Sequence, residues 1–210
     1  MGFAICSFNN VVLFSKSINV ATLIALNMPI LCEVHAIVWL PTELYESLKI
    51  RGVTDVFSNM GIDVRSYENP ADISLDTDAR NCVVSWKVPR RLIGSCWLIS
   101  TTDTYRRFKG DVVSCRVTKL GNELFIKCGK NVECLDAATV ILEQCHNNLE
   151  IEALRILQSY QAEFGSLRVS DAVNALALEL NLDRMKSREL LSKLVNLGLL
   201  RIRRGFVEIL

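Results

Sequence analysis

The sequence predicts two domains of different class, an α/β domain over residues 1–147 and a domain of three helices and a β-hairpin over residues 148–210. The division follows a change in composition near residue 147. Before it, the apolar runs are short, rich in Val, Ile, Cys and Trp, and separated by turn residues. After it, Leu and Ala recur at helical spacing. Among the 210 residues, 50% are hydrophobic and 22% charged, which excludes a disordered chain.

The first domain is expected to alternate strands and helices. Apolar and β-branched runs predict strands over residues 2–8, 11–15, 30–39, 62–67, 97–100, 112–117 and 123–127. Helical spacing and capping residues predict helices over 18–27, from Pro41 to 48, from Thr102 to 108 and over 136–146. The turn residues between 117 and 123 predict a hairpin at that point.

The second domain is predicted to start with an amphipathic helix over residues 149–164 that Gly165 ends. A second helix is expected from a cap at Ser170 to about residue 180. Asp183 is expected to cap a third helix that Gly198 stops, because Gly readily adopts the left-handed conformation found after helices. Alternation over residues 199–210 predicts two strands that turn at residues 204 and 205.

This order of elements and several leucines resemble the winged helix-turn-helix family. The residues that carry the resemblance are Leu176, Ala177, Leu180, Leu182, Leu191, Leu194, Leu197, Gly198, Leu199 and Leu200. The chain departs from the family at Ser187, where an apolar residue is usual. The resemblance implies a DNA-binding protein, in particular a transcriptional regulator. The alternative is a scaffolding protein, because winged helices also dock other proteins.

The charges of the second domain favour duplex DNA as the partner. Residues 150–183 carry 2 basic and 6 acidic side chains, whereas residues 184–210 carry 7 basic and 2 acidic ones. A basic face is what phosphate neutralisation requires. The candidate nucleic-acid-binding residues are Arg184, Lys186, Ser187, Arg188, Lys193, Arg201, Arg203 and Arg204. The alternative for the same residues is a solvated face on a protein-docking domain.

The first domain has a weaker resemblance, to PIN-type nucleases. Its strands and its helix begun by Pro41 occur in a similar order, and the resemblance implies a carboxylate cluster of Glu46, Asp78 and Asp103 that holds divalent metal. The family's first acid is missing, since only Asn9, Asn10, Ser15 and Ser17 follow the first strand. The alternatives are therefore an active nuclease, a degenerate PIN-like scaffold, or an unrelated sensing or dimerisation domain in which Asp103 caps a helix.

No sequence motif indicates a cofactor or a bound metal. The chain contains no dinucleotide or P-loop fingerprint and no nucleophile elbow. Its eight cysteines form no C-x-x-C pair, so a structural zinc site is not expected. Most of the cysteines are expected to be buried thiols, with one or two disulfides as the alternative.

The sequence also predicts a chain without a membrane span. The longest apolar stretch, residues 18–40, is interrupted by Asn27, Pro29, Glu33 and His35. The first residues lack the basic region and cleavage site of a signal peptide, so a cytoplasmic location is expected. A homodimer is compatible with this composition, although no sequence feature indicates one.

Overall fold

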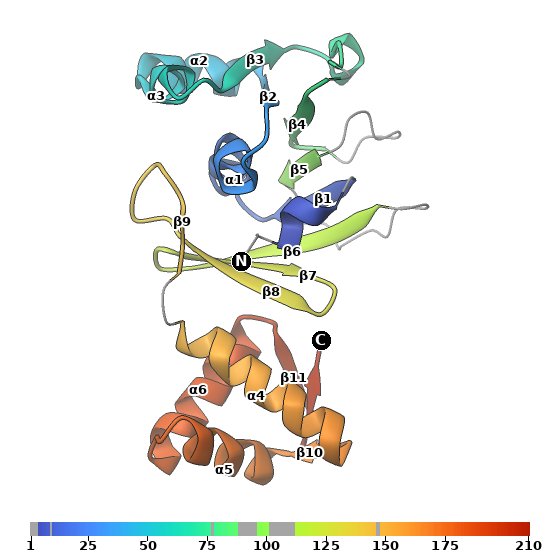
Figure 1. Cartoon of the computed structure of the whole chain (residues 1–210), viewed down its shortest axis with the longest axis vertical. Coiled ribbons are helices and arrows are strands. Elements are labelled where there is room, and N and C mark those ends of the chain that lie inside the picture. Colours follow the sequence, from blue (N-terminus) through green and yellow to red (C-terminus); the bar gives the residue numbers. More distant parts are fainter. Residues whose placement is uncertain (1–3, 9, 77, 88–95, 101–111, 146–147) are drawn as a thin grey trace. The chain divides into compact units, whose positions relative to one another are not determined.

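The computed structural model describes residues 4–8, 10–76, 78–87, 96–100, 112–145 and 148–210. Its contacts divide the chain into two compact units, Met1–Glu143 and Gln144–Leu210 (Figure 1). The sequence placed the boundary between residues 147 and 148. Among the described residues, no helix has the length and apolar character needed to cross a membrane.

Unit 1 is an α/β unit with a mostly parallel sheet of nine strands in the described residues, in the order β3-β2-β4-β5-β1-β6-β7-β8-β9. The strands from β3 to β6 run parallel, and β7 and β8 continue the sheet in antiparallel fashion. The strands are β1 (Val11–Ser15), β2 (Ala36–Pro41), β3 (Asp63–Tyr67), β4 (Arg80–Ser85), β5 (Cys96–Ser100), β6 (Val113–Leu120), β7 (Glu123–Cys128), β8 (Asn131–Asp136) and β9 (Glu143–Gln144).

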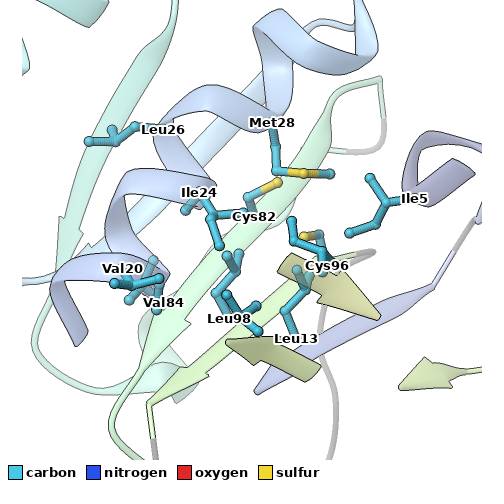
Figure 2. Close-up of a cluster of buried hydrophobic side chains, with 14 of the residues drawn as sticks. Ile5, Leu13, Val20, Ile24, Leu26, Met28, Cys82, Val84, Cys96 and Leu98 are labelled. Atoms are coloured by element: carbon cyan, nitrogen blue, oxygen red, sulfur yellow. The ribbon is translucent and has the colours of Figure 1, made fainter. Parts of the chain in front are cut away.

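The parallel strands are buried on both faces, which explains their continuous apolar sequences. Every residue of β1 and of β2 is buried. One face packs beneath α1 (Ile18–Cys32), where Ile24 and Met28 lie against Cys82 and Leu98 (Figure 2). The other face forms a separate cluster that includes Trp97.

Helix α1 is longer than predicted, and the strand predicted over residues 30–39 begins only at Ala36. Asn27 and Pro29 suggested an earlier stop. The amide of Asn27 is instead buried and fully used, since it donates to Leu23 O (2.8 Å) and Val140 O (2.9 Å) and accepts from Leu142 N (2.8 Å). A buried polar side chain satisfied in this way does not interrupt a helix.

Three other expectations need correction or fall outside the described part. Residues 4–7 form a short 3-10 helix (Ala4–Ser7) instead of a strand. In addition, α2 (Thr42–Ile50) is followed by a helix that was not predicted, α3 (Val53–Asn59). The helix predicted over 136–146 is not found in the described residues 136–145, because residues 131–136 pair with β7 as strand β8 and residues 143–144 form β9. The helix predicted from Thr102 lies outside the described residues.

The cysteines are more oxidised than the sequence suggested. Disulfides join Cys6 to Cys32 and Cys115 to Cys128, and Cys134 and Cys145 are disulfide-bonded as well. Only Cys82 and Cys96 are free, and both are buried. The expectation of mostly free thiols was wrong because spacing along the chain does not show which cysteine side chains face one another. Cys115 and Cys128, for example, lie directly opposite one another on β6 and β7.

Unit 2 contains three helices and a small sheet. The helices are α4 (Leu149–Phe164), α5 (Val169–Glu179) and α6 (Arg184–Asn196), close to the predicted ranges. The strands β10 (Leu167–Arg168), β11 (Leu200–Arg203) and β12 (Phe206–Ile209) pair in the order β10-β12-β11. The turn between β11 and β12 uses Arg204 and Gly205, both with positive φ (51° and 81°), as two-residue hairpins of this kind require.

Candidate nucleic-acid interface

Helix α6 presents a buried side and an exposed basic side. Its first turn is capped by Asp183, whose Oδ1 accepts a hydrogen bond from Lys186 N at 2.8 Å. The buried side consists of Ser187, Leu190, Leu191 and Leu194. Arg184 and Arg188 are exposed and lie one turn apart, so they form neighbouring positions on the helix surface.

The cations of α6 fall into two groups. Lys186 pairs with Asp183 at 3.7 Å, and Lys193 pairs with the buried Glu150 of α4. In the described part of the chain, no ion pair involves Arg184 or Arg188. The two lysines are therefore partly neutralised within the domain, and the two arginines keep their full charge for a ligand.

The β11–β12 hairpin likewise carries one arginine with an acidic partner and two without. Arg201 donates from Nε (3.1 Å) and from a terminal nitrogen (2.7 Å) to Glu208, its cross-strand neighbour. Arg203 and Arg204 are exposed, and the described residues supply no carboxylate partner for either. Arg204 lies in the turn itself, where its backbone places the side chain at the tip of the hairpin.

A further arginine, Arg168, escaped the sequence analysis. It lies on β10 opposite Phe206, and Phe206 lies opposite Arg203 on β11. The guanidinium of Arg168 is 5.9 Å from the centre of the Phe206 ring. One row across the sheet thus reads arginine, phenylalanine, arginine. Strand β10 has two residues, too few to show an alternating pattern in the sequence.

Ser187 does not reach the surface. Its side chain is fully buried, and its hydroxyl donates to the Asp183 carbonyl at 2.9 Å. A serine bonded to the carbonyl four residues earlier satisfies its own polar group inside the helix. This explains how a serine occupies a position that is usually apolar in the family it resembles, and it excludes Ser187 from the exposed basic surface.

Most acidic residues of unit 2 lie on the other two helices. Helix α4 carries Glu150, Glu152 and Glu163, and α5 carries Asp171 and Glu179. On α6 only Glu189 is acidic, and it is exposed.

The hydrogen bond from Lys186 N lowers the pKa of the Asp183 cap.

The three carboxylates suggested by the PIN-type resemblance occupy different places. Glu46 is exposed on α2, which follows the carboxyl end of β2, whereas Asp78 precedes the amino end of β4. Because β2 and β4 run parallel, these positions belong to opposite ends of the sheet. The structure therefore does not bring Glu46 and Asp78 together, and Asp103 lies outside the described residues.

The position of the missing first acid is held by serines. The hydroxyl of Ser15, the last residue of β1, donates to Ser17 O at 3.1 Å and accepts from Ser17 N at 3.2 Å. Neither serine supplies the negative charge that a divalent cation requires.

Known proteins add no assignment to these sites. No protein-family model, no curated protein and no solved structure matches the chain. The distribution of charge and the order of elements in unit 2 are therefore the evidence that bears on function.

Proposed function

We propose that unit 2 is a winged helix-turn-helix domain that binds duplex DNA, and that the chain acts as a transcriptional regulator. One observation carries this proposal. In the described part of unit 2, the exposed arginines that lack an acidic partner gather on α6 and on the small sheet, with the single exception of Arg155 on α4. They are Arg168, Arg184, Arg188, Arg203 and Arg204.

The order of elements supports the same proposal. Unit 2 runs helix, strand, helix, helix and two strands, and the first strand pairs with the last. In the winged-helix plan the third helix enters the major groove and the hairpin forms the wing beside it. Helix α6 and the β11–β12 hairpin, which hold four of the five arginines, occupy these two places.

The two groups of arginines suit different parts of DNA. Arg184 and Arg188 project from a helix, from which a guanidinium can bind the edge of guanine with two hydrogen bonds. Arg203 and Arg204 lie at the end of a hairpin, where contacts to phosphate position a protein without reading sequence. Lys186, Lys193 and Arg201 have partners inside the domain and are assigned mainly to its stability.

The experiment is a fluorescence anisotropy titration of labelled random-sequence duplex with the full chain at low salt. Two double variants, R184A/R188A and R203A/R204A, are compared with Arg155→Ala as the matched control. We expect both double variants to weaken binding to random duplex, because each removes two cations that can neutralise phosphate. Arg155→Ala should bind as the wild type does. A wild type that binds no duplex at low salt would overturn the proposal.

A second candidate function, protein docking, rests on a different observation. Between α4 and α5 lies a hollow of about 420 Å³, lined by Tyr160, Phe164, Ser166, Leu167, Asp171, Asn174, Ala175 and Leu178. At its rim, Phe164 is 63% exposed and Leu178 is 75% exposed. Exposed apolar patches mark interaction sites when they are contiguous. Phe164→Glu should leave DNA binding unchanged if the two functions use separate surfaces.

A further inference from the structure

The two free cysteines of the chain lie side by side in the core of unit 1. Cys82 on β4 and Cys96 on β5 are register partners on neighbouring parallel strands. Both are fully buried. Figure 2 shows their side chains beneath α1, and Met28 of that helix belongs to the same buried cluster. The pair remains reduced in a chain whose other six cysteines are disulfide-bonded.

Strand direction explains why this pair is not a disulfide. Neighbouring strands lie about 4.8 Å apart, whereas the two Cβ atoms of a disulfide need a separation near 3.8 Å. The antiparallel pair Cys115 and Cys128 has a Cα–Cα distance of 4.3 Å and is oxidised. Metal–sulfur bonds are about 2.3 Å long, so an ion between two thiolates holds the sulfurs up to about 4.6 Å apart. The spacing of in-register parallel neighbours is therefore better suited to a bridging ion than to an S–S bond.

We propose that Cys82 and Cys96 form a two-thiolate site for a soft monovalent ion, Cu(I). Soft sulfur ligands select Cu(I) over hard cations. Met28 of α1 offers a thioether as a third ligand of the same character. The ligands come from β4, β5 and α1, elements of one packed core, so the fold itself sets their positions.

The charge of the loaded site has a counterion nearby. Binding breaks two S–H bonds, releases two protons to solvent and forms two S–Cu bonds, and neither copper nor sulfur changes oxidation state. The site then carries one negative charge. Arg80, two residues before Cys82 on β4, acts electrostatically on Cys96. Among the described residues, no hydrogen-bond partner reaches its buried Nε, and its terminal nitrogens donate to Cys6 O (3.4 Å) and Phe8 O (2.6 Å).

In the absence of an ion, the surroundings of Cys96 favour its protonated thiol. The neighbouring Cys82 and burial together raise the pKa of Cys96. Copper must therefore displace protons, and its affinity should rise with pH. A site that took up a neutral molecule would show no such dependence.

An ion can reach the two sulfurs only if the packing around them opens, because both side chains are fully buried. Ile5, on the 3-10 helix Ala4–Ser7, belongs to the same buried cluster as Cys82 and Cys96 (Figure 2). The Cys6–Cys32 disulfide ties this segment to the end of α1. The double variant C6S/C32S should therefore take up copper faster, with little change in affinity.

The test is a competition between the full chain, with its disulfides intact, and a chromogenic Cu(I) chelator under ascorbate without oxygen. We expect the wild type to remove one copper ion per chain, with affinity that rises with pH. Cys82→Ser and Cys96→Ser each remove a ligand, so each should lower the affinity by more than the roughly 10–100-fold that loss of an outer-shell partner costs. Met28→Leu should lower it less, and Met60→Leu, at an exposed methionine, should have no effect.

X-ray absorption of the loaded wild type keeps the proposal testable even if the cysteine variants do not fold. The copper should have only sulfur neighbours, two or three of them. Nitrogen or oxygen neighbours, copper retained equally by Cys82→Ser, or no copper removed from the chelator would each overturn the proposal. A Cys82–Cys96 disulfide in a non-reducing peptide map of the purified protein would also overturn it.

Discussion

The buried carboxylate of Glu150 on α4 forms an ion pair with the ammonium of Lys193 on α6. The side chain of Glu150 is 7% exposed, and that of Lys193 is 41% exposed. The pair connects the first and third helices of unit 2 and gives a buried acid its counterion. Lys193 therefore has an acidic partner, unlike Arg184 and Arg188 of the same helix, although the sequence alone grouped the three residues as one basic surface.

Lys193→Ala should therefore act on stability more than on DNA affinity. Removing the lysine leaves a buried carboxylate without its partner, at a cost of about 1–3 kcal/mol in the free energy of unfolding. Chemical denaturation measures this cost, and anisotropy with random duplex measures affinity. A stable variant that loses DNA affinity would instead assign Lys193 to the interface.

Leu194 should be among the most sensitive core positions of unit 2. Its side chain is fully buried, so Leu194→Ala should lower the free energy of unfolding by about 2–5 kcal/mol. Leu178, 75% exposed on α5, is the matched control for the same substitution and should cost less than about 0.5 kcal/mol. Equal losses at the two positions would contradict the packing of α6 described above.

The Asp183 cap should make the stability of unit 2 depend on pH in the acid range. Its pKa is lowered in the folded state, because the ionised carboxylate accepts the hydrogen bond from Lys186 N. The stabilisation is complete above the unfolded pKa of about 3.9 and is lost as the pH falls through the lower folded value. Asp183→Asn keeps a capping side chain that does not titrate.

Thermal unfolding of the wild type and of Asp183→Asn across this range measures the effect. The difference between their midpoints should shrink as the pH falls below about 4. A constant difference across the range would show that ionisation of Asp183 contributes nothing.

The chain should not cleave nucleic acid with Mg²⁺ or Mn²⁺. Ser15 and Ser17 stand where the PIN-type pattern places its first acid, and Asp78 precedes β4 at the other end of the sheet from the start of α2. Incubation of labelled RNA and DNA with each metal measures this. Cleavage by the wild type that Asp103→Asn abolishes would restore the nuclease alternative.

Local signals predicted unit 2 well. Helices α4 and α6 begin and end within a residue of their expected positions, because caps at Asn148 and Asp183 and a stop at Gly198 act over a few neighbouring residues. The hairpin turn at Arg204 follows the same logic. These features depend on chemistry within one turn of the chain, which a sequence displays directly.

Long-range pairing accounts for what the sequence did not reveal. The partners of Cys6 and Asn27 come from elements farther along the chain, so neither the Cys6–Cys32 disulfide nor the length of α1 followed from local pattern. The ion pair of Lys193 with Glu150 was hidden for the same reason, whereas that of Arg201 with Glu208 joins opposite residues of the predicted hairpin. A charge count includes such residues in a basic surface, although their partners partly neutralise them.

The salt dependence of DNA binding tests the central claim most directly. Binding of random-sequence duplex by the wild type and by R203A/R204A is measured by anisotropy at several salt concentrations between about 50 and 200 mM. If both arginines contact phosphate, the slope of log affinity against log salt should fall by about two in the double variant, about one for each lost contact. An unchanged slope, or a wild type that does not bind at the lowest salt, would contradict the assignment of α6 and the hairpin to DNA.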